Sequence, residues 1–147
     1  MDRERIENIM HSDTDKLDRI FALQAELDGD ISERRGLDKP SDGNKCEWIQ
    51  RKTLAMVSEL AELLDEVNFK WWKNPKPIDD DRIKSELVDI LHFFVSMCLT
   101  AGMDAGELYG RYLDKNKENF DRQYGRSAKK GYDVEERNPE GKPADRN

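Results

Sequence analysis

Two acidic doublets with the same spacing place the strongest constraint on how this chain can fold. Glu59 and Glu62 lie in one apolar-patterned segment, and Glu86 and Asp89 lie in the next. Residues three apart project from the same face of an α-helix, so each doublet predicts a helix with two carboxylates on one side. Four carboxylates facing one another across a helix pair repel unless a hard cation such as Mg²⁺ takes their oxygens as ligands. Because such a metal can hold a polyphosphate and activate water, the doublets indicate a metal-dependent nucleotide hydrolase.

Length and charge narrow the class of protein further. A chain of 147 residues predicts one domain with a moderate core. It is 39% charged with a net charge of −7, and it has no basic block, which argues against a nucleic-acid partner. The N-terminal segment is too charged for a secretory signal, and no apolar run reaches the length of a membrane span. With two cysteines, Cys46 and Cys98, reduced thiols in the cytoplasm are expected.

The apolar periodicity predicts an all-α chain. Helices are expected over about residues 14–32, 48–67, 82–101 and 104–124, as a four- to five-helix bundle-like domain over residues 1–125. The polar stretch 126–147 lacks periodicity and is expected to be a mobile tail or to order on substrate binding. In the second helix the expected inner face consists of Leu54, Val57, Leu60, Ala61 and Leu64. The third helix is apolar nearly all round, which predicts a central helix and a homodimer that buries part of the third or fourth helix.

One ionisable stripe crosses this apolar third helix. Glu86, Asp89 and His92 follow one another at intervals of three residues. The ordinary interpretation is a solvent-facing stripe, because acidic pairs at this spacing are common. A second doublet on the preceding helix favours a site instead, since buried charges need a partner or a metal.

At this point the sequence resembles a known family. Glu59-Leu-Ala-Glu62 followed by Glu86-Leu-Val-Asp89 is similar to the E-x-x-E … E-x-x-D signature of the all-α nucleotide pyrophosphohydrolases, which include the MazG-like enzymes and the dimeric dUTPases. Three further stretches are similar to the dUTPase branch: FKWWKN at 69–74, ELVDILHF at 86–93 and KNKENFDRQ at 115–123. The resemblance covers about residues 23–123.

The resemblance implies roles for further residues. Gln24 and Asp28, in a Gln-x-x-Leu-Asp pattern, would recognise the base, Trp72 would stack on it, and His92 would lie near the sugar. Basic and amide groups would contact the phosphates, and these are Lys70, Lys73, Lys115, Asn119 and Arg122. The last three fall on one helix face and suit phosphate oxygens. By composition alone, a solvated helix face with ordinary ion pairs is the favoured interpretation, and the resemblance reverses that preference.

Asp28 bears on the choice of base. Many members of the resembled family carry Asn at this position. An amide both donates and accepts, whereas an ionised carboxylate only accepts. Asp28 could therefore pair with uracil N3–H or with a cytosine amino group, but not with a carbonyl.

The sequence thus predicts an all-α homodimer that hydrolyses dUTP, and by resemblance dUDP, to dUMP. Glu59, Glu62, Glu86 and Asp89 would hold two or more Mg²⁺ ions, or Mn²⁺ as a substitute, and Glu59 or Glu62 would take a proton from water. A MazG-like enzyme with another or broader nucleotide preference is one alternative. A non-enzymatic helical nucleotide-binding or regulatory protein is another. A di-iron bundle is disfavoured, because Asp89-x-x-His92 has no second such unit.

Overall fold

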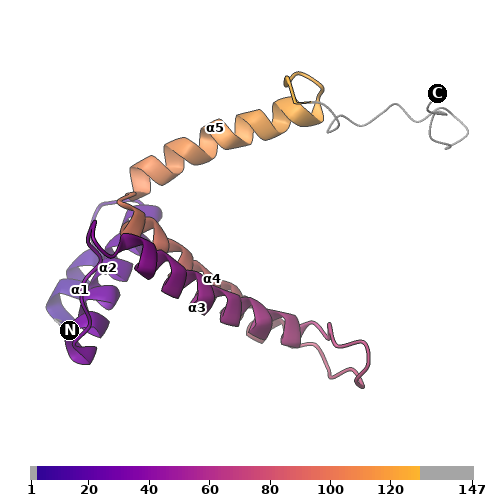
Figure 1. Ribbon diagram of the computed structural model, residues 1–147, viewed down its shortest axis with the longest axis horizontal. Helices are drawn as coiled ribbons and strands as arrows, with labels where there is room; N and C mark the ends of the chain where they lie inside the picture. Colours follow the sequence, from indigo (N-terminus) through magenta and orange to yellow (C-terminus); the bar gives the residue numbers. More distant parts are fainter. Residues whose placement is uncertain (1–2, 130–147) are drawn as a thin grey trace, which may run out of the picture. The chain divides into compact units, whose positions relative to one another are not determined.

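The computed structural model describes residues 3–129, and in that range it consists of five α-helices without a strand (Figure 1). They are α1 (Arg3–Met10), α2 (Lys16–Arg35), α3 (Lys45–Glu66), α4 (Asp80–Ala101) and α5 (Ala105–Gln123). The all-α prediction is confirmed, although α1 was not among the expected helices. No single helix in this range is long and apolar enough to cross a membrane, and α4 and α5 reach such a length and apolarity only when joined. The expected polar tail lies outside the described residues from residue 130 onward.

The ends of the helices follow local sequence signals. At the start of α4, the side chain of Asp79 accepts hydrogen bonds from two backbone N–H groups of the first turn, which satisfies donors that have no partner within the helix. Gly102 ends α4 in the left-handed conformation, with φ of 83°, where a residue without Cβ is favoured. Asp104 then opens α5 by accepting from the backbone N–H of Glu107 at 2.8 Å.

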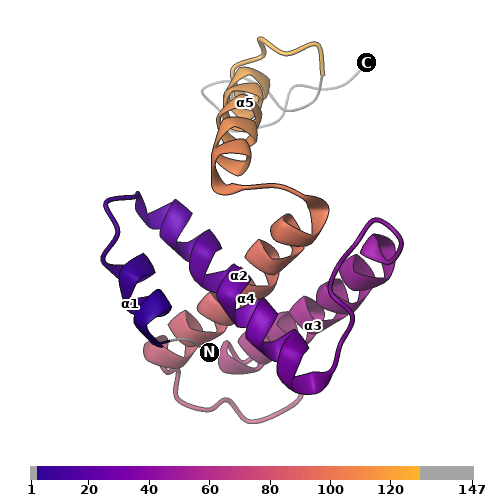
Figure 2. The same cartoon turned by 90° about the vertical axis from the view of Figure 1, so that its left-hand side faces the viewer.

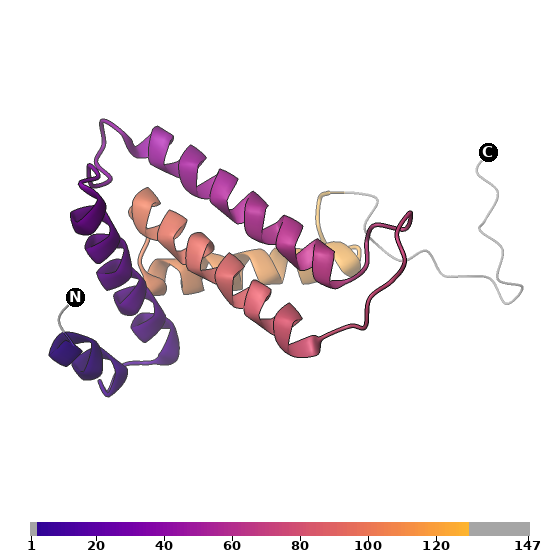
Figure 3. The ribbon, with the colours of Figure 1, turned by 90° about the horizontal axis from the view of Figure 1, so that it is seen from below.

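The described part of the chain divides into two compact units, one up to Leu108 and the other from Tyr109 onward. In the first unit α4 packs against both α3 and α2, and α1 packs against α2. Figures 2 and 3 show α3 and α4 running side by side in opposite directions. In Figures 1 and 3, α2 meets this pair at the end opposite to the loop that joins α3 to α4. The second unit contains most of α5.

The hydrophobic core of the first unit is small. Its buried side chains are Phe21 of α2, Val95 and Cys98 of α4, and Ala105 at the start of α5. Val95 is only 1% exposed and lies at the centre of the α2–α4 contact region. The core therefore joins α2 to the C-terminal half of α4 and leaves the α3–α4 pair to be held by other contacts.

The expected inner face of α3 points away from α4. Leu54 is 70% exposed and Val57 is 53% exposed, and Leu60, Ala61 and Leu64 of the same row are exposed too. The prediction of that inner face is wrong, because a neighbouring row of α3 meets α4. In that row the half-buried side chains of Ile49, Met56 and Leu63 alternate with Lys52, Glu59 and Glu66.

The exposed row on α3 has a counterpart on α4. There Leu87, Val88, Leu91 and Phe94 are 39–51% exposed. Apolar surface of this extent is typical of an interface with another chain. We therefore predict that the protein is a homodimer at micromolar concentration, measured by sedimentation equilibrium.

A charge in the exposed row tests this prediction. Leu54→Glu should shift the protein to monomer, because the carboxylate would lose its hydration at the interface. A charge reversal away from this row, Glu33→Lys on exposed α2 surface, should leave association unchanged. A wild-type protein that sediments only as monomer would contradict the prediction.

Candidate active site

Three carboxylates meet where α3 and α4 run side by side. Glu59 and Glu62 from α3 and Glu86 from α4 each offer one oxygen, and these oxygens all lie within 4.8 Å of one another. Glu59 and Glu86 are half-buried, whereas Glu62 is exposed. A set of carboxylate oxygens at this separation is the donor type that Mg²⁺, Ca²⁺ and Mn²⁺ prefer.

The electrostatics of this cluster are unfavourable in the absence of a cation. Burial raises the pKa of Glu59 above its usual value, and the charges of Glu62, Asp89 and Glu86 raise it further. Asp89 therefore lies close enough to act on Glu59, although it is not part of the group of three. Both doublets predicted from the sequence face one another, and a divalent cation would relieve their mutual repulsion.

A second polar group adjoins the first along α4. His92 follows Asp89 by one helical turn, and its Nδ1 lies 2.7 Å from Oε1 of Gln24 on α2. The amide Nε2 of Gln24 donates to Oδ1 of Asp28 at 2.8 Å. Gln24 is only 6% exposed. The structure thus brings together three of the residues that were predicted to contact the base and sugar.

A lysine from α3 completes this group. Lys52 Nζ donates to Asp28 Oδ2 at 3.1 Å, to the Ser96 carbonyl at 3.2 Å and to Thr100 Oγ1 at 2.8 Å. The hydroxyl of Ser96 also donates to Asp28 Oδ2. Sequence reasoning missed Lys52, although it precedes Glu59 by seven residues and therefore lies on the same side of α3. In the same way, the hydroxyl side chains of Ser96 and Thr100 lie further along the face of α4 that carries Asp89 and His92.

Several hollows border this hydrogen-bonded chain. One, of about 460 Å³, has Gln24 and His92 among walls that are otherwise apolar side chains of α1, α2 and α4. A smaller one, of about 220 Å³, is lined by Asp28, Lys52 and Trp48 among others. Lys52 Nζ also lies 5.7 Å from the ring centroid of Trp48, within range of a cation–π contact. Trp48 is an aromatic group beside Asp28 that the sequence analysis did not single out.

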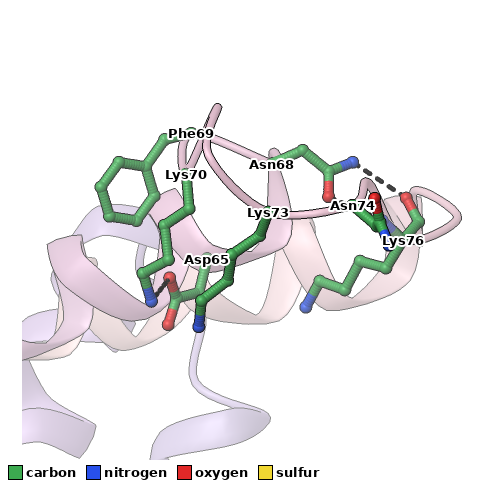
Figure 4. A pocket seen from close by; sticks show the side chains of 7 residues that line it. All are labelled: Asp65, Asn68, Phe69, Lys70, Lys73, Asn74 and Lys76. Carbon is green, nitrogen blue, oxygen red and sulfur yellow. Dashed lines mark hydrogen bonds and ion pairs between the residues drawn. The ribbon is translucent and has the colours of Figure 1, made fainter.

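The loop between α3 and α4 carries the predicted lysines in a separate pocket (Figure 4). Lys70 forms an ion pair with Asp65, and this contact lowers the pKa of that carboxyl group. The backbone N–H of Lys73 donates to the Lys70 carbonyl at 2.9 Å, and its side chain extends beside the pair without a hydrogen bond or ion pair to the residues that the structure describes. Asn68 fixes the loop by exchanging two hydrogen bonds of 2.9 Å with the backbone of Lys76. The loop is therefore ordered by its own contacts.

Trp72 belongs to the same loop and lies apart from Gln24. Its ring meets Phe69 edge-on at 6.2 Å and Trp71 at 5.7 Å between centroids. It is 60% exposed. The loop occupies the end of the α3–α4 pair away from α2 (Figure 3). Within one chain the structure does not bring Trp72 to Gln24, Asp28 and His92.

The predicted phosphate-binding residues of α5 lie in the second unit. Lys115 and Asn119 are exposed on that helix. Arg122 is more buried and its Nε donates to Glu118 Oε1 at 2.9 Å, which holds the pKa of that carboxyl group below its usual value. Contact between these three residues and a phosphate stays a prediction.

Comparison with known proteins gives one family. A family model described as dUTPase matches residues 16–105. A dCTP pyrophosphatase of Enterobacteria phage T4 is 51% identical over 105 residues, which cover 55% of this chain and 61% of that protein. A dCTP pyrophosphatase of Enterobacteria phage LZ5 is 28% identical over 151 residues, covering 82% of this chain and 87% of that protein. This chain thus spans less than two thirds of the length of the T4 relative, and no solved structure gives a significant match.

The matched residues contain α2, α3 and α4, and so both the carboxylate cluster and the Gln24–Asp28–Lys52 group. The all-helical architecture agrees with this match. The chain belongs to the all-α dUTPase family.

Proposed function

We propose that this chain hydrolyses a pyrimidine deoxynucleoside triphosphate to its monophosphate and pyrophosphate with the help of a divalent cation. The cluster of Glu59, Glu62 and Glu86 carries this proposal, together with the imidazole further along α4 that contacts the buried amide of Gln24. Carboxylates suit the metal that a triphosphate requires, and an amide suits the edge of a base. The names of the phage relatives support the same reaction class.

The carboxylates of the two doublets fit Mg²⁺, with Mn²⁺ as a substitute, and we propose two or more ions. Glu59, Glu62, Glu86 and Asp89 would hold them, because these residues face one another and their charges are otherwise uncompensated. A cation held there supplies positive charge to the phosphates and promotes the deprotonation of attacking water. Glu59 or Glu62 would accept that proton. No nucleophilic side chain is required.

The phosphates and the outer face of the base need residues from elsewhere. We propose Lys115, Asn119 and Arg122 as phosphate donors, with Lys73 as a further cation. Stacking by Trp72 would come from the partner of a homodimer, because the loop that carries it lies away from Gln24 in the same chain.

We propose dCTP as the preferred substrate and dUTP, with dUDP, as the second candidate. The carboxylate of Asp28 can only accept hydrogen bonds, and it stands beside the amide of Gln24. A cytosine amino group donates, whereas the corresponding uracil carbonyl accepts. The dUTPase family match and the Gln24-Ala-Glu-Leu27 pattern keep dUTP as a candidate.

A nucleotide panel tests this proposal. Formation of the nucleoside monophosphate from dCTP, dUTP, dUDP and dTTP, measured at one Mg²⁺ concentration, should give the highest kcat/KM for dCTP and a lower value for dUTP. A highest value for dUTP would reverse the order of the two candidates. Absence of hydrolysis of every nucleotide, with Mg²⁺ or Mn²⁺, would favour the non-enzymatic binding protein.

Substitution of one metal-facing carboxylate tests the catalytic assignment. Glu62→Gln should lower kcat by about 100-fold or more, the scale on which one electrostatic contact acts in a catalytic site. The variant should remain folded, because Glu62 is exposed and its removal relieves repulsion. Glu33→Gln, on the exposed surface of α2, is the matched control and should keep full activity. Near wild-type turnover by Glu62→Gln would overturn the metal site.

The raised pKa of Glu59 predicts a pH-dependent stability without metal. A pKa that is higher in the folded state than in the unfolded state stabilises the fold at low pH, and this contribution is lost as pH rises through the folded-state pKa. Glu59→Gln should therefore have a higher Tm than wild type at pH 7 in chelator. The difference should shrink towards about pH 4, where an ordinary glutamate begins to protonate.

Added Mg²⁺ should reverse this order. It should raise the Tm of the wild type, because it binds the folded state, and raise that of Glu59→Gln much less. Thermal denaturation in chelator and in Mg²⁺ measures both effects. A Glu59→Gln variant that is less stable than wild type in chelator at pH 7 would show that the carboxylates do not repel as described.

A further inference from the structure

We propose that Lys52 and Asp28 fix the tautomer of His92 through the amide of Gln24, and thereby select the pyrimidine that the site accepts. The effect on the tautomer depends only on the contacts among these four residues. The effect on substrate choice rests on the proposed function as well. Lys52 and Asp28 are therefore positioning residues that act through Gln24 and His92.

The first step is the fixed position of the lysine. An ammonium group has three donors and no acceptor, and Lys52 Nζ has three acceptors within 3.2 Å on Asp28, Ser96 and Thr100. Its side chain is only 11% exposed. Whatever occupies position 28 must consequently present an oxygen to Lys52 and to the Ser96 hydroxyl.

The second step orients the amide. The other oxygen of Asp28, Oδ1, lies 2.8 Å from Gln24 Nε2. An ionised carboxylate only accepts, so the nitrogen of the amide must face Asp28 and its oxygen must face the opposite way. A reversed amide would place its oxygen against Asp28 Oδ1, so two acceptors would face each other at a side chain that is only 6% exposed.

The third step sets the imidazole. Gln24 Oε1, which only accepts, lies 2.7 Å from Nδ1 of His92. The proton of the neutral ring must therefore be on Nδ1, and Nε2 is left as an acceptor. His92 and Gln24 both line the hollow of about 460 Å³. The imidazole thus offers an acceptor, which suits the amino group of cytosine and not the carbonyl of uracil.

The same contacts predict what an amide at position 28 would do. In Asp28→Asn, Lys52 and the Ser96 hydroxyl would still require an oxygen on their side, so the new NH₂ group would face Gln24. The Gln24 amide would then turn over, and its nitrogen would donate to Nδ1 of His92. The ring would carry its proton on Nε2 and offer a donor, which suits the uracil carbonyl.

Nitrogen-15 NMR of the histidine side chains tests the relay in the full chain without nucleotide. The chain has two histidines, so His11, in the turn after α1, is an internal reference in each spectrum. At a pH where both rings are neutral, as judged from their titration curves, His92 of the wild type should be protonated on Nδ1. In Asp28→Asn the protonated nitrogen should be Nε2, and His11 should not change.

Asp30→Asn is the matched control variant. It makes the same chemical change two residues along α2, at a carboxylate that pairs with Arg34, and it should leave His92 unchanged. A wild-type His92 protonated on Nε2 would overturn the relay, and this result needs no variant to fold. A folded Asp28→Asn in which His92 keeps its proton on Nδ1 would also overturn it.

Nucleotide kinetics then test the effect on specificity. The ratio of kcat/KM for dCTP to that for dUTP should fall in Asp28→Asn on the order of 10-fold, the value of one mismatched hydrogen bond. An unchanged ratio with a changed tautomer would overturn the link to substrate choice. If the tautomers behave as expected but no nucleotide is hydrolysed, the proposed function fails and the relay stands. If a nucleotide is hydrolysed but His92 of the wild type carries its proton on Nε2, the relay fails and the proposed function stands.

Discussion

The contact between α3 and α4 depends on how three charged side chains of α3 are neutralised. Lys52, Glu59 and Glu66 lie on the side of α3 that faces α4, where apolar residues would ordinarily pack. Lys52 pairs with Asp28, and Glu66 accepts from Lys76 at 3.0 Å and from an arginine of α4 at 3.4 Å. Glu59 instead meets only further carboxylates among residues 3–129. The middle position of this row is thus the one that requires a cation from solution.

The parts of the structure that could be predicted are those that depend on residues close together in the sequence. Helix type, the caps at Asp79 and Gly102, and the meeting of the two acidic doublets follow from local spacing, because residues three or four apart share a helix face. The proximity of Gln24 to Asp28 on α2 was also predictable, since these two residues share a helix face. Which residues of α4 they meet depends on tertiary packing, which the sequence pattern did not reveal.

The errors have one physical cause. The apolar row of α3 at Leu54 and Val57 satisfies the pattern of a core face, yet it points outward, and the neighbouring row of mixed apolar and charged residues meets α4 instead. Periodicity identifies an apolar face but not its partner. Similarly, the pattern around Trp72 gave no information on which end of the helix pair the loop would occupy.

The buried ion pair of Lys52 and Asp28 adds little to the stability of the fold by itself. Removing two charges from water costs free energy that their attraction only offsets when the remaining donors and acceptors are satisfied, and an apolar pair of similar volume is often as stable. Here the carboxylate and the ammonium group both have further partners, and no buried side-chain nitrogen or oxygen in the described chain lacks one. Such a network has one arrangement of donors and acceptors at low energy. Its proposed consequence is therefore that Lys52 on α3, through Asp28 on α2, orients the Gln24 amide and the His92 ring, and so selects the atoms that a ligand meets.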